Sequence, residues 1–269
     1  MSTAASPIGI FDSGIGGLTV VREVIRQLPC ERIVYFGDTA RVPYGPKSPD
    51  TVRRYSREIT DYLTSQDVKA IVVACNTATA HALPQLRREL AVPVIGVIEP
   101  GARAGVAATR RRELGVIGTA GTIASRAYET AIRAIAPDAH IVARACPLFV
   151  PLVEEGWLNT EATRLIAHEY LAPLQAAGVD TLVLGCTHYP LLKPLLGDIL
   201  GSDVVLIDSA HETAAEIARV LATHGLLADS ASERGLHRFI ASDAPEHFLR
   251  LGQRFLGSAI ECVETLTLG

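Results

Sequence analysis

Two segments of this 269-residue chain decide its fold and its chemistry: AIVVACNTATAHAL (Ala70–Leu83) and TLVLGCTHYPLL (Thr181–Leu192). In each, a short apolar run containing β-branched residues ends in a small residue, then a cysteine, then polar residues that include threonine. Such a run predicts a buried strand that ends at the cysteine. Cys75 and Cys186 therefore follow matched strands, and we expect them to form one site with an acid/base group on each side.

A second matched pair supports a duplicated chain. PIGIFDSGIGGLT (Pro7–Thr19) and ELGVIGTAGTI (Glu113–Ile123) are both strand-like runs that end in a Gly/Ser/Thr turn opening a helix. Each precedes its cysteine segment by a similar distance, and the period is far too long for a solenoid. We interpret the chain as two similar α/β halves related by approximate two-fold symmetry.

Strand and helix patterns alternate through both halves. The predicted strands are Ile8–Phe11, Ile33–Phe36, Ala70–Ala74, Val94–Val97, Leu114–Ile117, His140–Ala143, Thr181–Leu184, Val204–Ile207 and His237–Ser242. The predicted helices are Leu18–Gln27, Pro49–Ser65, Thr77–Leu90, Thr122–Ala136, Thr160–Ala177, Leu191–Leu200 and Glu212–His224.

This alternation predicts two doubly wound α/β domains with mainly parallel sheets and an active site between them. We expect residues 1–98 plus 211–269 to form the domain that carries Cys75. Residues 99–210 would form the domain that carries Cys186.

Composition is that of a globular enzyme. The chain is 48% hydrophobic and carries a net charge of −4, which gives no reason to expect nucleic acid or an anionic membrane as partner. Met1–Ser6 lacks the charged start and apolar core of a signal peptide, and no apolar run approaches a membrane span. Five cysteines without a CxxC motif indicate neither a disulfide framework nor a metal site, so we expect the protein to work in the reducing cytoplasm.

A thiol at a strand end that feeds a helix lies near backbone N–H groups and the positive end of a helix dipole. This arrangement is expected to lower the pKa of Cys75 and Cys186 and to favour the thiolate. The other three cysteines, Cys30, Cys146 and Cys262, are expected to be buried packing residues.

Polar residues around the cysteines are typical of a site for a carboxylate ligand. Asn76, Thr77 and Thr187 offer amide, hydroxyl and backbone donors at helix starts, where they could equally serve as caps. The glycine-rich loop Asp12–Gly17 offers a further anion pocket, although it matches neither the Walker nor the GxGxxG pattern. In the loop Gly37–Gly45, the Tyr44 hydroxyl could donate to a ligand.

Titratable groups lie close to both cysteines in the sequence or in the predicted layout. His188 follows Cys186 by two residues, and Glu154 lies in a loop or helix start after a strand region. A histidine beside a thiol can act as a base, an acid or an orienting group. Asp12 is the matching candidate for Cys75.

The segments FDSGIGGLTV, YFGDTARVPYG, VACNTATA, GVIEPG, IGTAGT, CPLFVPLVEEG and LGCTHYPLL resemble, in collinear order from Ile8 to about Ala210, the glutamate racemases of the aspartate/glutamate racemase superfamily. The resemblance implies a cofactor-independent isomerase, working in the cytoplasm, that supplies D-glutamate for peptidoglycan and hence for cell-wall biogenesis and cell shape. It also implies L- and D-glutamate as partners, and a homodimer.

The same resemblance implies residue roles. Cys75 would take the Cα proton of D-glutamate with help from Asp12, and Cys186 that of L-glutamate with help from His188 and Glu154. The choice of Glu154 rather than the neighbouring Glu155 rests on motif spacing alone. Substrate-binding residues would be Asp12, Ser13, Tyr44, Gly45, Asn76, Thr77, Thr187 and His188, with Thr119 and Thr122 as further candidates.

Three alternatives remain. The first is an aspartate racemase of the same superfamily. Those enzymes tend to carry Glu after the second Cys-Thr, whereas this chain has His188, which favours glutamate. A cysteine hydrolase or acyl transferase could use Cys186 and His188, but Cys75 would then have no role. A non-enzymatic binding protein could use the same fold.

Overall fold

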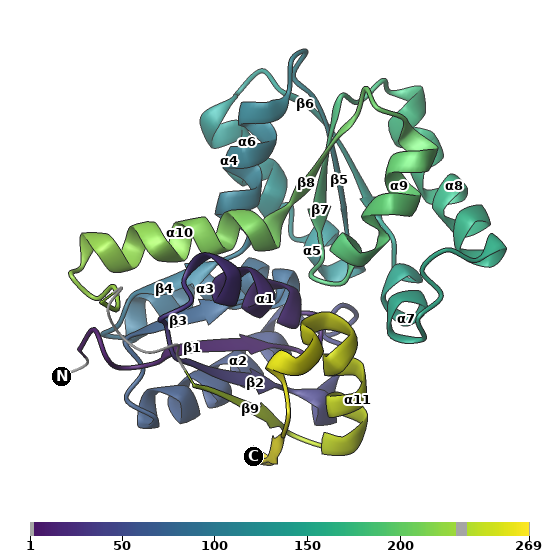
Figure 1. Cartoon of the computed structure of the whole chain (residues 1–269). Coiled ribbons are helices and arrows are strands. Elements are labelled where there is room, and N and C mark those ends of the chain that lie inside the picture. The colour runs from purple at the N-terminus through teal and green to yellow at the C-terminus, as the bar shows by residue number, and fades with distance from the viewer. Residues whose placement is uncertain (1–2, 230–235, 269) are drawn as a thin grey trace.

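Two parallel β-sheets with helices on both faces make up the described part of the chain, residues 3–229 and 236–268 of a computed structural model (Figure 1). Within these residues the first sheet has six strands in the order β10-β9-β2-β1-β3-β4. The bounds are β1 (Ile8–Asp12), β2 (Ile33–Gly37), β3 (Ala70–Val73), β4 (Val94–Gly96), β9 (His237–Ala241) and β10 (Glu264–Thr265).

The second sheet has four strands in the described residues, in the order β6-β5-β7-β8. Their bounds are β5 (Glu113–Gly118), β6 (His140–Ala145), β7 (Thr181–Gly185) and β8 (Val205–Asp208). Four strands of the first sheet, β2-β1-β3-β4, follow the same pattern, in which the first strand pairs with both the second and the third. The cysteine strands β3 and β7 therefore occupy equivalent places in their sheets.

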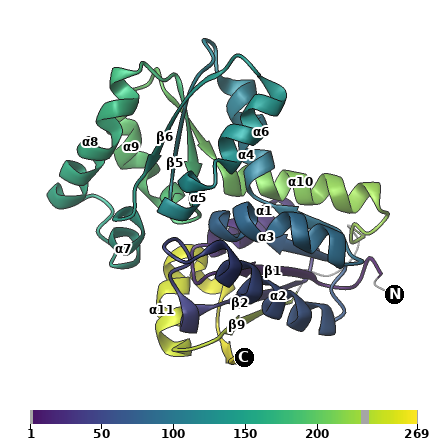
Figure 2. The same cartoon turned by 180° about the vertical axis from the view of Figure 1, so that it is seen from behind.

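Helices cover both faces of both sheets, as Figures 1 and 2 show from opposite sides. The helix bounds are α1 (Leu18–Gln27), α2 (Pro49–Ser65), α3 (Asn76–Glu89), α4 (Ile98–Ala108), α5 (Ala120–Ala124), α6 (Ala127–Ile135), α7 (Phe149–Glu154), α8 (Glu161–Ala176), α9 (Lys193–Leu200), α10 (Ser209–Thr223) and α11 (Pro245–Leu256). Helices α2 and α3 pack on one face of the first sheet, while α1, α10 and α11 pack on the other. Helices α4 and α6 cover one face of the second sheet, and α8 and α9 cover the other.

Continuous apolar burial explains why these runs form central parallel strands. Every residue of β1, β2, β3 and β7 is buried, as expected for strands covered on both sides. One core cluster runs from Leu18 on α1 through Ile117 on β5 to Leu195 on α9, so it links the two sheets. The expected α/β architecture with two parallel sheets is confirmed.

Several sequence predictions need correction. The predicted helix Thr122–Ala136 is interrupted, because Arg126 adopts a left-handed conformation (φ 58°) between α5 and α6. The predicted helix Leu191–Leu200 starts as a 3₁₀ turn, Tyr189–Leu192, before α9. Helices α4 and α11 and strand β10 were not predicted. The proposed crossing at residue 99 lies in the first turn of α4, whose Pro100 is tolerated there because first-turn N–H groups lack helical partners.

Chain crossings and the C-terminal strand complete the layout. The strand predicted at His237–Ser242 is confirmed as β9, which pairs in parallel with β2 of the first sheet. Asp208, at the predicted return crossing, is the N-cap of α10 and accepts a hydrogen bond from the backbone of Ala210. The domain boundaries themselves stay a prediction. Within the described ranges, no helix combines the length and apolar character needed to cross a membrane.

Candidate active site

Both matched cysteines face one small cavity between the two sheets. Cys75 follows β3, Cys186 follows β7, and each is 5% exposed. The cavity has a volume of about 40 Å³, room for only a few waters, and it lies beyond the carboxyl ends of the strands. All the candidate residues except Thr122 line it: Asp12, Ser13, Tyr44, Gly45, Cys75, Asn76, Thr77, Thr119, Glu154, Cys186, Thr187 and His188.

The Cys75 sulfur caps helix α3. It accepts a hydrogen bond from the backbone N–H of Ala78 at 3.4 Å and lies 3.7 Å from the Ser13 hydroxyl. These contacts favour the thiolate, but burial and the nearby Asp12 carboxylate outweigh them and raise the pKa of Cys75 to about 12. The expectation of a lowered pKa is therefore wrong for Cys75, which is a neutral thiol at physiological pH.

Cys186 has a different partner. Its sulfur lies 3.8 Å from His188 Nδ1, and the other ring nitrogen, Nε2, lies 2.9 Å from Glu154 Oε1. Burial alone would lower the pKa of His188, but the contacts with Cys186 and Glu154 raise it to about 10. An imidazolium that donates from Nδ1 stabilises negative charge on the Cys186 sulfur. The two thiols therefore stand in opposite electrostatic environments.

The structure distinguishes the two adjacent glutamates at the end of α7. Glu154 contacts His188, whereas Glu155 lines a separate apolar surface hollow near Trp157. Arg254 of α11 donates to the backbone carbonyl of Glu154 at 3.1 Å, which ties α7 to the C-terminal helix. Of the two glutamates, Glu154 is the one that contacts His188, and its catalytic role stays a prediction.

Hydroxyl and amide donors form the other wall. Thr77 Oγ1 lies 2.9 Å from Thr119 Oγ1 and 3.3 Å from Thr122 Oγ1, across the contact between α3 and α5 (Figure 2). Asn76 Nδ2 is buried without a hydrogen-bond partner among the described residues. A buried unpaired donor is costly, so a bound acceptor such as a carboxylate would satisfy it.

Asp12 and Tyr44 both make structural bonds that sequence reasoning did not foresee. Asp12 Oδ2 accepts from the backbone N–H groups of Gly14 (3.2 Å) and Gly17 (3.1 Å), so it shapes the glycine loop while keeping its charge near Cys75. The Tyr44 hydroxyl donates to buried Asp38, which also accepts from Arg41. The Tyr44 hydroxyl therefore donates its hydrogen bond within its own loop. This bond to Asp38 holds the loop beside the cavity. In the sequence, the signal for Asp38 was an acidic residue directly after the apolar run that forms β2.

The glycine loop brings the two halves together at the second cysteine. Thr19 Oγ1 donates to the Thr187 carbonyl at 2.9 Å. A Cβ on Gly16 would lie 2.5 Å from His188 Cε1 and would also crowd the Thr187 hydroxyl. Only glycine allows so close an approach of this loop to Thr187 and His188.

The other cysteines differ in burial. Cys146 is buried as expected, but Cys30 is only half-buried and Cys262 is exposed, so the full burial predicted for those two is wrong. No cluster of His, Cys, Asp and Glu suited to a metal ion occurs in residues 3–229 or 236–268.

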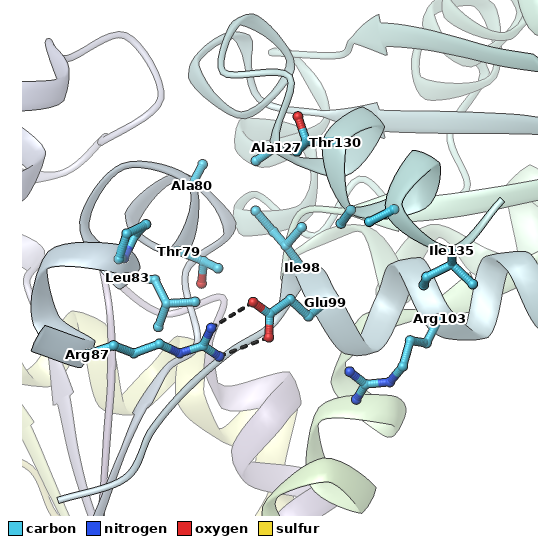
Figure 3. Close-up of a pocket in the computed structure, with 13 residues that line it drawn as sticks. Thr79, Ala80, Leu83, Arg87, Ile98, Glu99, Arg103, Ala127, Thr130 and Ile135 are labelled. Atoms are coloured by element: carbon cyan, nitrogen blue, oxygen red, sulfur yellow. Dashed lines mark hydrogen bonds and ion pairs between the residues drawn. The ribbon is translucent and has the colours of Figure 1, made fainter. Parts of the chain in front are cut away.

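A much larger cavity lies elsewhere, between α3, α4 and α6 (Figure 3). It measures about 690 Å³ and is lined mainly by apolar side chains such as Leu83 and Ile135, together with the Arg87–Glu99 ion pair. It lacks cysteine and histidine, and its paired charges leave no group poised for proton transfer. Size therefore does not identify the chemical site in this molecule.

Comparisons with known proteins agree with this geometry. A family model described as Asp/Glu/hydantoin racemase matches residues 8–217. A Geobacter metallireducens glutamate racemase is 57% identical over 97% of this chain and 96% of its own length. Glutamate racemase RacE1 of Bacillus anthracis superimposes with a TM-score of 0.93 at 42% identity, covering 98% of this chain and 97% of that one. The Francisella tularensis glutamate racemase, solved in complex with D-glutamate, has a TM-score of 0.91 at 37% identity and 98% coverage of both chains.

Proposed function

This chain belongs to the Asp/Glu/hydantoin racemase family, and we propose that it is an isomerase that interconverts L- and D-glutamate by proton transfer between two cysteines. The observation that carries the mechanism is the pair of buried thiols lining one cavity with opposite electrostatic partners. Close, nearly full-length relatives act on glutamate, which supports that substrate over aspartate. D-glutamate made in this way enters peptidoglycan.

The partners of the two thiols suit the L-to-D direction, because a His188 cation next to Cys186 stabilises a thiolate there. The thiolate of Cys186, stabilised by the His188 cation, takes the Cα proton of L-glutamate. The neutral Cys75 thiol then delivers its own proton to the opposite face of the planar carbanion. After this step Cys75 is the thiolate and Cys186 the thiol, so the reverse reaction starts from the product state.

Stabilisation of the carbanion falls to the donors around the α-carboxylate, because the Cα proton is only weakly acidic. The free Asn76 Nδ2 and the hydroxyls of Thr77 and Thr187 are the candidate donors, and Ser13 and Gly45 complete the wall. Such preorganised donors are effective in a small cavity from which water is displaced. The rival hydrolase mechanism leaves Cys75 without a role, whereas racemisation uses both sulfurs.

The proposal extends to a cytoplasmic homodimer that works without a cofactor, as the family resemblance implies. Light scattering of the purified protein tests the dimer. Full racemisation after exhaustive dialysis against a chelator, with no pyridoxal phosphate present, tests the cofactor prediction.

Incubation with L-glutamate in deuterated water tests the function and the mechanism together. The D-glutamate formed should carry deuterium at Cα from its first appearance, while the remaining L-glutamate stays protiated at early times. The reason is that the delivering thiol has exchanged with solvent and differs from the thiol that removed the proton. Early deuterium in both enantiomers alike, or faster turnover of aspartate than of glutamate, would contradict the proposal.

A further inference from the structure

Tyr128 is a buried side chain with contacts to both cysteine loops. It lies on α6, packs in the core under the second sheet and is 2% exposed. It lies outside the set of residues that line the cavity, so it makes no direct contact with a substrate there.

Its first contact reaches the loop of Cys75. The Tyr128 hydroxyl donates to Asn76 Oδ1 at 2.8 Å. An amide whose oxygen is held on one side must direct its nitrogen to the other. Asn76 Nδ2 is the buried donor that has no partner among the described residues, and Asn76 lines the cavity. The bond from Tyr128 therefore selects which end of this amide is offered to a ligand.

Its second contact reaches the loop of Cys186. The Tyr128 ring packs against Gly185, the residue before Cys186, so closely that a Cβ there would lie 2.8 Å from ring atom Cε2. The tip of the ring also lies beside the two chain crossings: a Cβ on Gly101 of α4 would lie 3.3 Å from the Tyr128 hydroxyl and 3.3 Å from Ser209 Cβ on α10.

We propose that Tyr128 is a positioning residue for racemisation: it joins the residues flanking the two thiols and turns the Asn76 amide so that its N–H donors face the substrate carboxylate. The inference rests on the proposed function. The interrupted helix gives a structural reason for it, because the break at Arg126 starts α6 anew and places Tyr128 on its buried face.

Tyr128→Phe keeps the ring and removes only the hydroxyl. We expect kcat/KM to fall about 3- to 10-fold, equally for both enantiomers since their equilibrium constant is one, the size of one lost hydrogen bond. In an Asn76→Ala background, Tyr128→Phe should have no further effect on kcat/KM, because Asn76 is already gone and the other partner of the hydroxyl, Ser209, does not line the cavity. The matched control is Tyr189→Phe, which loses an equally buried 2.8 Å bond to the Cys146 carbonyl. Its effect should multiply with that of Asn76→Ala.

A second variant tests the inference even if the Tyr128→Phe protein does not fold. Gly101→Ala adds a methyl group within a helix, where alanine is favoured, and presses on the Tyr128 hydroxyl. It should lower kcat/KM roughly 2- to 5-fold, with no further loss in the Asn76→Ala background. Tyr128→Phe with wild-type kcat/KM, or either variant acting independently of Asn76→Ala, would overturn the inference. A wild-type protein that does not racemise glutamate would instead overturn the proposed function.

Discussion

Gly16→Ala tests whether close contact between the two halves sets the geometry of Cys186. The added Cβ would lie 2.5 Å from His188 Cε1, whereas ordinary contact begins at 3.4 Å, so the loops must separate by about 0.9 Å. Gly16 does not have a positive φ, so alanine fits its backbone and the effect is purely steric. The obstacle is a buried ring held by Glu154 rather than the free end of a flexible chain.

A displacement of about 1 Å at reacting groups can cost about 100-fold in rate. We therefore expect kcat/KM of Gly16→Ala to fall about 100-fold for both enantiomers, with overpacking lowering the free energy of unfolding by about 1–3 kcal/mol. The assay follows the optical activity of glutamate from each pure enantiomer, with urea unfolding measured on the same samples.

The matched control is Gly197→Ala on α9, where the added Cβ meets only Leu206 at 3.9 Å. It should keep wild-type kinetics. A folded Gly16→Ala protein with activity within threefold of the wild type would refute the reasoning, because the two halves could then separate without disturbing the site.

Removal of either thiol, by Cys75→Ala or Cys186→Ala, should abolish racemisation, since one face of Cα then lacks a proton carrier; measurable racemisation by either variant above the uncatalysed rate speaks against two-base catalysis. Glu154→Gln should lower kcat/KM about tenfold by replacing a charge-assisted bond to His188 with a neutral one, while the adjacent control Glu155→Gln stays at the wild-type rate; equal losses in the two variants would contradict the assignment. His188 has a folded pKa raised to about 10 from an ordinary value of 6.5, so its contribution to stability is complete below pH 6.5 and is lost as pH rises towards 10; the difference in unfolding free energy between the wild type and His188→Asn should shrink over that range, and a difference that grows would show the opposite sign. Lys69→Met should destabilise the fold by about 3–5 kcal/mol, because it leaves Glu31 buried without its 2.5 Å partner; kcat per folded molecule should not change, and near-wild-type stability would show that the pair is dispensable.

Local sequence was sufficient to predict the strands other than β10 and most of the helices. Helices α1 and α2 match their predicted bounds, because a strong amphipathic pattern marks each of them. In α2 the start is also marked by the N-cap Ser48 and by Pro49, which follows it. Helix α4 was not predicted because its Pro-Gly pair is typical of a turn. Burial of Ile98 and Ala102 against the second sheet favours the helix.

The candidate site likewise has one part that the sequence could predict and another that it could not. Each cysteine, its following threonine and the glycine loop could be found in the sequence, because parallel strands carry such residues at their carboxyl ends. The bond between the Tyr44 hydroxyl and Asp38 could not be predicted, since the two residues lie six positions apart in an irregular loop and their burial decides that the hydroxyl turns inward.

By itself, the sequence determined the α/β class, the matched pair of cysteines and the set of polar residues near them, since these depend on short-range patterns and the fixed polarity of parallel strands. Only the tertiary structure decided the electrostatic surroundings of the two thiols. The helix N-terminus predicted a thiolate at Cys75, but burial beside Asp12 keeps it neutral, while Glu154, 34 positions from His188 in the chain, keeps that imidazole charged beside Cys186. Charge state in a buried site depends on desolvation and on partners brought from distant segments, and neither is a property of local sequence.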